Sequence, residues 1–354
     1  TGNLEDIREC IGCNVCYAHD SLGVPIRCTQ NPTMGEEWRN GWHPEKVIIT
    51  KKRKRVLVVG SGPAGLEASR VLGKMGHKVA LAEKSRELGG RIVTEAKLPG
   101  LSEWIRVRDW RITQINKCQN IEVFPESFMT GDSVLELGYE DVIIATGARW
   151  AKDTIGRHSD CDFKKADVKM IISGDEILES PIKSKSKFLI YDDDHYYFGS
   201  VLALELKKQG HEVTLVSPAG RVCSWGEFTD EQTRSNTEVM KAGIQVINNY
   251  KIEIVMNGSA ELYCIFSGEP KKVSCDFVVP ITRKIPVTDL YDDLCSRVEY
   301  WGSNGVQKVI KIGDAEAPSI IAAAVHSGYR SAIEIDNPFS EALNFSRREH
   351  PLIK

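Results

Sequence analysis

Residues 56–65 read Val-Leu-Val-Val-Gly-Ser-Gly-Pro-Ala-Gly, an apolar run that turns through three glycines. Apolar positions then recur at helical spacing as far as Met75, so the stretch predicts a buried strand, a tight turn and a helix. Gly60 permits the turn, Gly62 lets backbone N–H groups approach a pyrophosphate, and Gly65 allows close contact between helix and strand. A phosphate would bind at the helix N-terminus, where free amides and the helix dipole favour negative charge.

The segment that follows gives this loop a structural context. Residues 76–83 read Gly-His-Lys-Val-Ala-Leu-Ala-Glu, which predicts a second strand that ends in an acidic residue. Glu83 lies at the sequence distance expected of a carboxylate that binds a ribose hydroxyl. Together the loop and the acid predict a site for an adenine dinucleotide or ADP, with a purely structural glycine turn as the alternative.

Four cysteines lie near the N-terminus in a close-set pattern. Cys10, Cys13 and Cys16 form a C-x2-C-x2-C run, and Cys28 follows twelve residues later. Such spacing curls the backbone so that successive sulfurs point inward, and it predicts a 4Fe-4S cluster. A zinc site, which usually divides its ligands two and two, and a pair of disulfides are the alternatives. We expect the other six cysteines to be reduced thiols.

A second strand–helix–strand pattern occurs later in the chain. Residues 187–191 predict a strand and residues 198–209 a helix, and residues 210–217 repeat the pattern of residues 76–83 position by position. The repetition predicts a second domain of the dinucleotide-binding type.

This second copy lacks the glycine loop. Residues 192–199 read Asp-Asp-Asp-His-Tyr-Tyr-Phe-Gly, and Ser217 stands where the first copy has Glu83. Three carboxylates repel phosphates and the tyrosines block close approach of the backbone, so we predict a fold that has lost its nucleotide. The acidic residues are predicted to form a solvated turn. The alternative interpretation is a metal site formed by Asp192, Asp193, Asp194 and His195.

Composition restricts the function classes. The 354 residues carry a net charge of −3, which gives no electrostatic basis for binding nucleic acid or an anionic membrane. The chain has no signal-peptide pattern and no apolar run as long as a membrane span, so we expect a cytoplasmic location. Because it starts at Thr1, nine residues before the first cysteine, it is interpreted as the later part of a longer protein.

The cysteine segment resembles a known family. Residues 8–16, 28–31 and 35–45 are similar to the cluster segment of the trimethylamine dehydrogenase family, which includes dimethylamine and histamine dehydrogenases. The related 2,4-dienoyl-CoA reductases have one more residue between their second and third cysteines. Further along, Gly89-Gly90-Arg91, the Ala-Thr-Gly at 145–147 and the pair Gly313-Asp314 resemble motifs of the disulfide-reductase type of FAD domain.

The resemblance implies a fold and its boundaries. The expected class is α/β, with two Rossmann-like domains of the FAD/NAD(P)-reductase type, the second inserted in the first, after an iron–sulfur segment. The segment is expected over residues 1–54, the ADP- or FAD-type domain over 55–172 and 303–354, and the degenerate NAD(P)H-type domain over 173–302. The resemblance adds Gly89, Gly90, Arg91 and Asp314 to the nucleotide site.

The resemblance also implies a function. An FMN held by a (β/α)8 barrel, as a preceding domain or separate subunit, oxidises an amine such as trimethylamine, dimethylamine or histamine. The cluster then passes electrons singly to an electron-transferring flavoprotein, ADP is bound as a relic of FAD, and the full enzyme is a homodimer. No catalytic acid or base is identified, and His19 and His43 are candidates only for tuning the cluster. The alternatives are an NAD(P)H-dependent reductase of the dienoyl-CoA type and a non-catalytic ADP-binding electron-transfer subunit.

Overall fold

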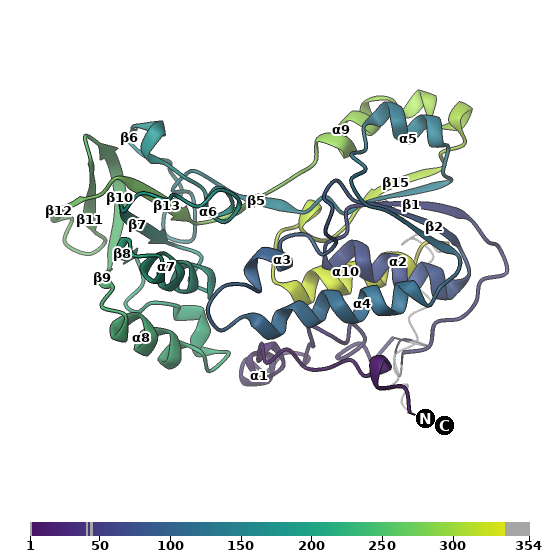
Figure 1. Ribbon diagram of the computed structural model, residues 1–354, viewed down its shortest axis with the longest axis horizontal. Helices are drawn as coiled ribbons and strands as arrows, with labels where there is room; N and C mark the ends of the chain where they lie inside the picture. Colours follow the sequence, from purple (N-terminus) through teal and green to yellow (C-terminus); the bar gives the residue numbers. More distant parts are fainter. Residues whose placement is uncertain (1, 40–41, 43–44, 337–354) are drawn as a thin grey trace, which may run out of the picture. The chain divides into compact units, whose positions relative to one another are not determined.

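The computed structural model describes residues 2–39, 42 and 45–336 (Figure 1). Contacts divide the chain into two compact units. Unit 1 comprises residues 1–96, 103–148 and 286–354 within those limits, and unit 2 comprises residues 97–102 and 149–285. Unit 2 is thus an insertion in the sequence of unit 1, and strands β5 (Ala148–Trp150) and β14 (Lys284–Pro286), where the chain passes between the units, pair with each other.

These divisions differ from the sequence boundaries at 172/173 and 302/303. Residues 165–166 form strand β6 (Lys165–Ala166), which pairs with β10 (Tyr250–Met256), so this stretch packs in unit 2. Helix α9 (Asp289–Ser296) packs in unit 1, where Leu294 is buried. The sequence motifs mark strand ends, whereas these connecting segments are assigned by packing that only the fold shows.

Unit 1 is built on a five-stranded parallel sheet in the order β15-β4-β1-β2-β3. Its strands are β1 (Arg55–Val59), β2 (Lys78–Ala82), β3 (Ile121–Phe124), β4 (Asp141–Ile144) and β15 (Lys308–Lys311). Its helices are α1 (Val15–Ser21), α2 (Pro63–Met75), α3 (Ile92–Glu95), α4 (Arg106–Asn116), α5 (Gly131–Leu137), α9 and α10 (Ile321–Ile333). The strand, turn and helix predicted at residues 56–75 are confirmed.

Both faces of this sheet are covered, which explains the continuous apolar run of β1. Val56 and Val58 point to a core shared with helices α2 and α10, while Leu57 and Val59 point to a second core with α5 and α9. Figure 1 shows α2, α4 and α10 on one side of the strands and α5 and α9 on the other. Successive strand side chains alternate between faces, so a sheet covered on both faces needs apolar residues at every position.

Unit 2 contains a parallel sheet in the order β13-β7-β8-β9 and a second sheet in the order β12-β11-β10-β6. The strands of the parallel sheet are β7 (Lys187–Asp192), β8 (Glu212–Ser217), β9 (Gln245–Asn248) and β13 (Phe277–Ile281). The others are β11 (Ser259–Cys264) and β12 (Pro270–Ser274), with helices α6 (Gly174–Glu179), α7 (Phe198–Lys208) and α8 (Gln232–Lys241). An apolar core lies between the two sheets and includes Leu189 and Leu262. The predicted second strand–helix–strand pattern is therefore present.

Candidate functional site

The glycine loop of unit 1 is shaped by close backbone contacts. Gly60 has φ +100°, and a Cβ there would lie 2.4 Å from the carbonyl oxygen of Ala145. A Cβ on Gly65 would lie 1.9 Å from the carbonyl oxygen of Gly60, so the start of α2 can approach β1 only without a side chain. A Cβ on Gly62, by contrast, would meet no atom within 4 Å. Gly60 and Gly65 are thus required by the fold, and Gly62 faces open space beside the N-terminus of α2.

A serine joins this loop to the predicted ribose-binding acid. Oε2 of Glu83 accepts hydrogen bonds from the backbone N–H and the hydroxyl of Ser61, at 2.8 and 2.7 Å. Its Oε1 accepts from the backbone N–H of Ser85 at 2.9 Å, and the N–H of Gly89 donates to Ser61 Oγ at 3.2 Å. The buried carboxylate therefore holds the loop in place. Sequence analysis did not single out Ser61, because nothing in a glycine motif identifies the residue between two glycines.

The remaining predicted nucleotide residues lie around the same loop. Gly90, at φ +60°, approaches so closely that a Cβ there would lie 3.1 Å from Gly62 Cα. Arg91 donates to the carbonyl oxygen of Ala148 at 2.5 Å, and Asp314 accepts from the N–H of Ser319 at 3.1 Å. Gly313 packs on the first turn of α2, where its Cβ would meet Ala64 at 2.6 Å. The structure brings Gly89 and Gly90 to the loop, while Arg91 and Asp314 bind backbone atoms.

The cysteine segment curls as its spacing predicts. Gly12 has φ +67° and Asn14 has φ +52°, both in the left-handed region, on either side of Cys13. Cys16 lies in the first turn of α1, whose N-cap is Asn14. The backbone N–H of Gly12 points to Cys10 Sγ at 3.3 Å. N–H donors directed at cysteine sulfurs are typical of segments that hold thiolates bound to metal.

All four cysteines are free thiols in this structure. Cys13 is in contact with the hydroxyl of Thr29 at 3.1 Å. Burial raises the pKa of Cys13, and the neighbouring Cys28 and Cys10 raise it further, although Thr29 opposes the rise. A bound cation would remove this repulsion between thiolates.

The thiols are not gathered as closely as the ligands of a bound zinc ion would be. Within the described residues, no three thiols lie within 4.8 Å of one another. A tetrahedral zinc ion with bonds of about 2.3 Å holds its sulfurs about 3.8 Å apart. A cubane places its thiolates at the four corners of a cube, which are farther apart. Four cysteines in this sequence spacing are the donor set of a 4Fe-4S segment, so the residues present fit that group.

A buried network of ion pairs packs next to the cysteine segment. Glu67 and Arg111 form an ion pair at 2.7 Å, Glu67 and Arg70 form another at 2.5 Å, and all three side chains are fully buried. Arg70 also reaches Glu45 at 2.7 Å, and Glu45 pairs with Arg8 at 2.7 Å. Burial raises the pKa of Glu67, but attraction from Arg70 and Arg111 outweighs it, and the pKa falls to about 2. These five residues are called the ion network below.

The ion network is connected directly to the cysteine segment. Arg111 donates to Oε1 of Gln30 at 2.9 Å and to its carbonyl oxygen at 3.2 Å, and Arg8 donates to the same carbonyl at 3.1 Å. Gln30 in turn donates to the carbonyl oxygen of Glu9 at 2.9 Å. Helices α2 and α4 therefore hold the residues next to Cys10 and Cys28. Sequence analysis did not identify this network, because its members are far apart in the chain.

The histidines and tryptophans of this segment are placed as follows. Nδ1 of His19 lies 3.0 Å from the carbonyl oxygen of Pro25, so the ring stabilises a local turn, and His43 lies outside the described residues. Trp42 packs against Tyr329 in the core of unit 1, whereas Trp38 is exposed.

Unit 2 repeats the framework of unit 1 closely. Nδ1 of His77 accepts the backbone N–H of Lys54 at 3.2 Å, and Nδ1 of His211 accepts that of Ser186 at 3.3 Å. The repeat ends at the turn after β7. There, the side chain of Asp192 fills the space beside Gly199, since a Cβ on Gly199 would lie 2.6 Å from the carboxyl carbon of Asp192.

The prediction of a solvated acidic turn at residues 192–194 is wrong. Asp192 and Asp193 are buried, at 1% and 0% exposure. Burial raises the pKa of Asp192 to about 7. Burial also raises the pKa of Asp193, but hydrogen bonds from His195 and His158 outweigh it and lower the pKa overall. No local sequence pattern could reveal that these carboxylates are buried and paired, because the partner residue His158 lies 35 residues earlier in the chain.

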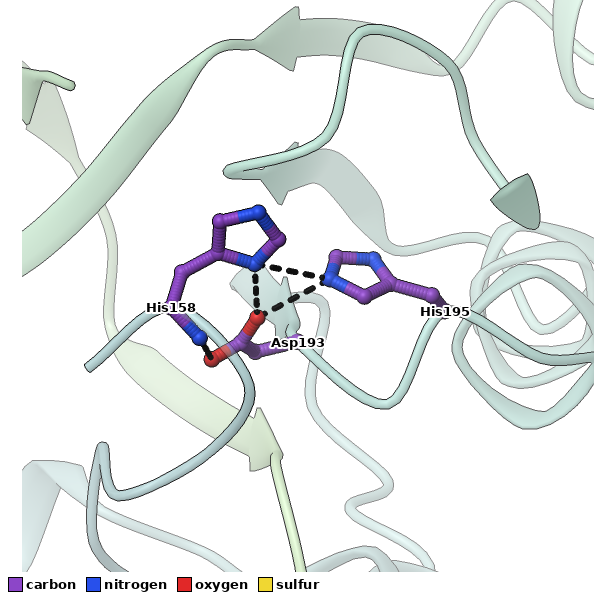
Figure 2. A group of neighbouring side chains, drawn as sticks. All are labelled: His158, Asp193 and His195. Atoms are coloured by element: carbon purple, nitrogen blue, oxygen red, sulfur yellow. Dashed lines mark hydrogen bonds and ion pairs between the residues drawn. The ribbon is translucent and has the colours of Figure 1, made fainter. Parts of the chain in front are cut away.

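The alternative metal interpretation named Asp192, Asp193, Asp194 and His195. The structure brings two of these four, Asp193 and His195, together with His158. Figure 2 shows that His158, Asp193 and His195 converge, with both rings directed at one carboxylate oxygen. Asp192 instead accepts the backbone N–H of His195 at 3.0 Å. Sequence analysis missed His158, which no motif accompanies.

In the described part of the chain, no helix is long and apolar enough to cross a membrane. Two family models match the sequence: the pyridine nucleotide-disulphide oxidoreductase model over residues 54–191 and the OYE-like second alpha/beta domain model over residues 172–296. They agree with an α/β architecture of Rossmann-like sheets. A thioredoxin reductase of T. acidophilum, at 15% identity and a TM-score of 0.53, shares the fold.

Closer relatives extend over nearly the whole chain. Dimethylamine dehydrogenase of Hyphomicrobium sp. (strain x) is 36% identical over 95% of this chain and 49% of its own length. The structure of histamine dehydrogenase from Rhizobium sp. 4-9 is 40% identical, with a TM-score of 0.92 over 95% of this chain and 52% of that one. That of 6-hydroxypseudooxynicotine amine oxidase from Pseudomonas geniculata N1 is 34% identical, with a TM-score of 0.88, over 93% and 49%.

The chain thus spans about half the length of the relatives it matches. Within that span, identity of 36–40% and a near-complete structural superposition agree with the resemblance in the cysteine segment. The chain belongs to the trimethylamine dehydrogenase family.

Proposed function

We propose that this chain is the electron-transfer portion of an iron–sulfur flavoprotein amine dehydrogenase. The observation that carries the proposal is the cysteine segment: four free thiols in close sequence spacing, curled by Gly12 and Asn14. A 4Fe-4S cluster bound there would supply single-electron transfer between a flavin and an external electron carrier.

The chain's own residues hold and orient that site. Cys10, Cys13, Cys16 and Cys28 would be the ligands, and Thr29 lies against the sulfur of Cys13. The ion network fixes Gln30, two residues after Cys28, while Arg106 binds the carbonyl oxygen of Cys10 at 3.0 Å. Among the described residues the network pairs the three cations Arg8, Arg70 and Arg111 with the two anions Glu45 and Glu67, so it carries net positive charge next to Gln30 of the cysteine segment.

The glycine loop would bind ADP. Its supports are the open space beside Gly62 and the free N–H groups in the first turn of α2, whose dipole attracts phosphate. Glu83 keeps hydrogen-bonding capacity for a ribose hydroxyl, because each carboxylate oxygen accepts more than one hydrogen bond. We favour ADP over FAD because unit 2 lacks the glycine turn of a nicotinamide dinucleotide site, leaving a flavin here without that electron donor.

The remaining parts of the enzyme are proposed from the names of its relatives. Its relatives include proteins named dimethylamine dehydrogenase and histamine dehydrogenase. We propose that this chain works with an FMN-bearing (β/α)8 barrel, as a domain or subunit, in which a C–N bond of an amine is oxidised. The electrons would leave through the cysteine segment to an electron-transferring flavoprotein, and the full enzyme would be a homodimer.

The test measures both ligands in the same preparation. Anaerobically purified protein is expected to contain about four iron and four sulfide per chain, with visible absorption that Cys13→Ala abolishes and Cys118→Ala retains. Stoichiometric zinc without sulfide would contradict the cluster. After denaturation, chromatography of the released nucleotide is expected to give one ADP per chain, whereas an equimolar FAD peak would contradict the ADP assignment alone.

A further inference from the structure

The turn after strand β7 in unit 2 gathers two imidazoles around one carboxylate. Nδ1 of His158 lies 2.8 Å from Oδ1 of Asp193, and Nε2 of His195 lies 2.9 Å from the same oxygen. The two ring nitrogens are 3.1 Å apart. Within the described residues, this is the one group of three or more histidine, cysteine or acidic side chains whose ligand atoms all lie within 4.8 Å of one another.

We propose that His158, Asp193 and His195 bind a divalent transition-metal ion of the zinc class. Two imidazole nitrogens and a carboxylate oxygen are ligands that such ions prefer, and three protein ligands leave a position open for water or a further ligand. The site stands at the strand–helix turn where unit 1 has its glycine loop, so a cation site would occupy the place of the lost phosphate site. This inference is independent of the amine dehydrogenase proposal.

The spacing of the three donor atoms suits an ion. Donors about 2.9 Å apart, each bonded at about 2.05 Å, subtend angles of about 90° at the ion, the arrangement of one octahedral face. Tetrahedral angles need donors about 3.3 Å apart, so the contacts would lengthen by about 0.2 to 0.5 Å. Either geometry is reached by small ring rotations. In both, the ion lies outside the plane of the three donors and so displaces none of them.

Hydrogen bonding alone leaves one of the three contacts without a hydrogen bond. Each of the two ring nitrogens carries at most one proton, and an ionised carboxylate only accepts. If both rings donate an N–H to Asp193, the two ring nitrogens face each other at 3.1 Å as two donors, with no hydrogen bond between them. If one ring instead donates its N–H to the other ring, one of the two contacts to the Asp193 oxygen has no hydrogen bond. An ion bonded to all three atoms satisfies every contact at once.

The residues around the cluster orient its ligands as supports of a metal site do. The outer nitrogen of His195, Nδ1, lies 3.4 Å from the hydroxyl of Ser217, which is itself fixed by donation to the carbonyl oxygen of Asp192 at 2.9 Å. The second oxygen of Asp193 accepts the backbone N–H of His158 at 2.9 Å. Such partners fix the orientation of metal ligands. Ser217, which in sequence replaces an acidic residue, thus has a role of its own.

Backbone conformation and access provide a further indication. His195 has φ +64°, in the left-handed region that histidine adopts more often than most residues other than glycine, and residues held there occur often at functional sites. The side chains of Asp193 and His195 are 0% and 5% exposed, whereas that of His158 is 38% exposed. An ion could therefore enter past His158 and be held by two buried ligands.

Zinc binding to the full chain tests the proposal. Protein with its iron content measured is treated with chelator, dialysed against micromolar zinc, and analysed for zinc and iron by mass spectrometry. The variants are His158→Gln, Asp193→Asn and Ser217→Ala, and the matched control is Asp194→Asn, which changes the neighbouring acid. Circular dichroism checks that each variant folds. Since His158 is half-exposed, His158→Gln keeps the test decisive even if Asp193→Asn does not fold.

Wild type and Asp194→Asn are expected to bind about one zinc per chain more than His158→Gln and Asp193→Asn. Ser217→Ala is expected to weaken zinc binding about 10- to 100-fold, as loss of an outer partner does. Zinc held only by the cysteines would appear equally in every variant. Equal zinc in wild type and His158→Gln, or none in wild type, overturns the proposal.

Discussion

Glu67→Gln is expected to destabilise unit 1 strongly, because it removes the anion between two buried arginines. Glu67, Arg70 and Arg111 are each fully buried, so the glutamine would leave Arg70 with Glu45 and would take from Arg111 the carboxylate with which it pairs. A Glu67 pKa that is lowered from 4.5 to about 2 corresponds to folding stability on the order of 3 kcal/mol at neutral pH. Breaking a buried pair by removing one partner typically costs about 3–5 kcal/mol, which agrees.

The loss should depend on pH in one direction. Because the pKa of Glu67 is lower in the folded state, its contribution is complete above the unfolded value of 4.5 and disappears as the pH falls through about 2. The difference in unfolding free energy between wild type and Glu67→Gln is thus expected to be constant from pH 8 to about pH 5 and to shrink below that.

Urea denaturation followed by circular dichroism, at several pH values, measures this difference. Glu103→Gln is the control, since Glu103 pairs with Arg106 on the surface of the same unit and exposed pairs contribute less than about 1 kcal/mol. The visible absorption of the cysteine segment, measured in parallel, is expected to weaken in Glu67→Gln, because the network holds Gln30. If Glu67→Gln costs no more than Glu103→Gln at pH 7, the reasoning is refuted.

Two further predictions concern the helix contact of unit 1 and the turn of unit 2. Gly328→Ala is expected to lower the unfolding free energy by about 2 kcal/mol or more, because the new Cβ would lie 2.2 Å from the carbonyl oxygen of Ala64. The control is Gly302→Ala, whose Cβ would meet no atom within 4 Å, and equal stability of the two variants in urea would contradict the prediction. Metal-free protein is expected to give a flat calorimetric titration with NADPH, because the β7–α7 turn lacks a glycine loop and the side chain of Asp192 packs against Gly199 there. Micromolar binding of NADPH would instead favour the reductase alternative.

The sequence was sufficient for features that depend on neighbouring residues. A glycine loop between an apolar strand and a helix, a strand ending in Glu83, and three cysteines in seven residues each prescribe local geometry, and the structure shows the strand, the turn, the helix and the curled segment. The repeat in unit 2 was visible for the same reason, since its strands and helix follow the same spacing. The loss of its glycine loop was equally plain.

Only the tertiary structure decided which distant residues meet. Arg111 and Glu67 lie 44 residues apart, and His158 and Asp193 lie 35 apart, so no local pattern joins them. The acidic turn shows the physical reason: a run of aspartates is usually solvated, but here the sheet end, His158 and the left-handed His195 bury two of them and provide partners. Whether a charge is buried depends on what packs over it, and the packing comes from parts of the chain that the local sequence does not contain.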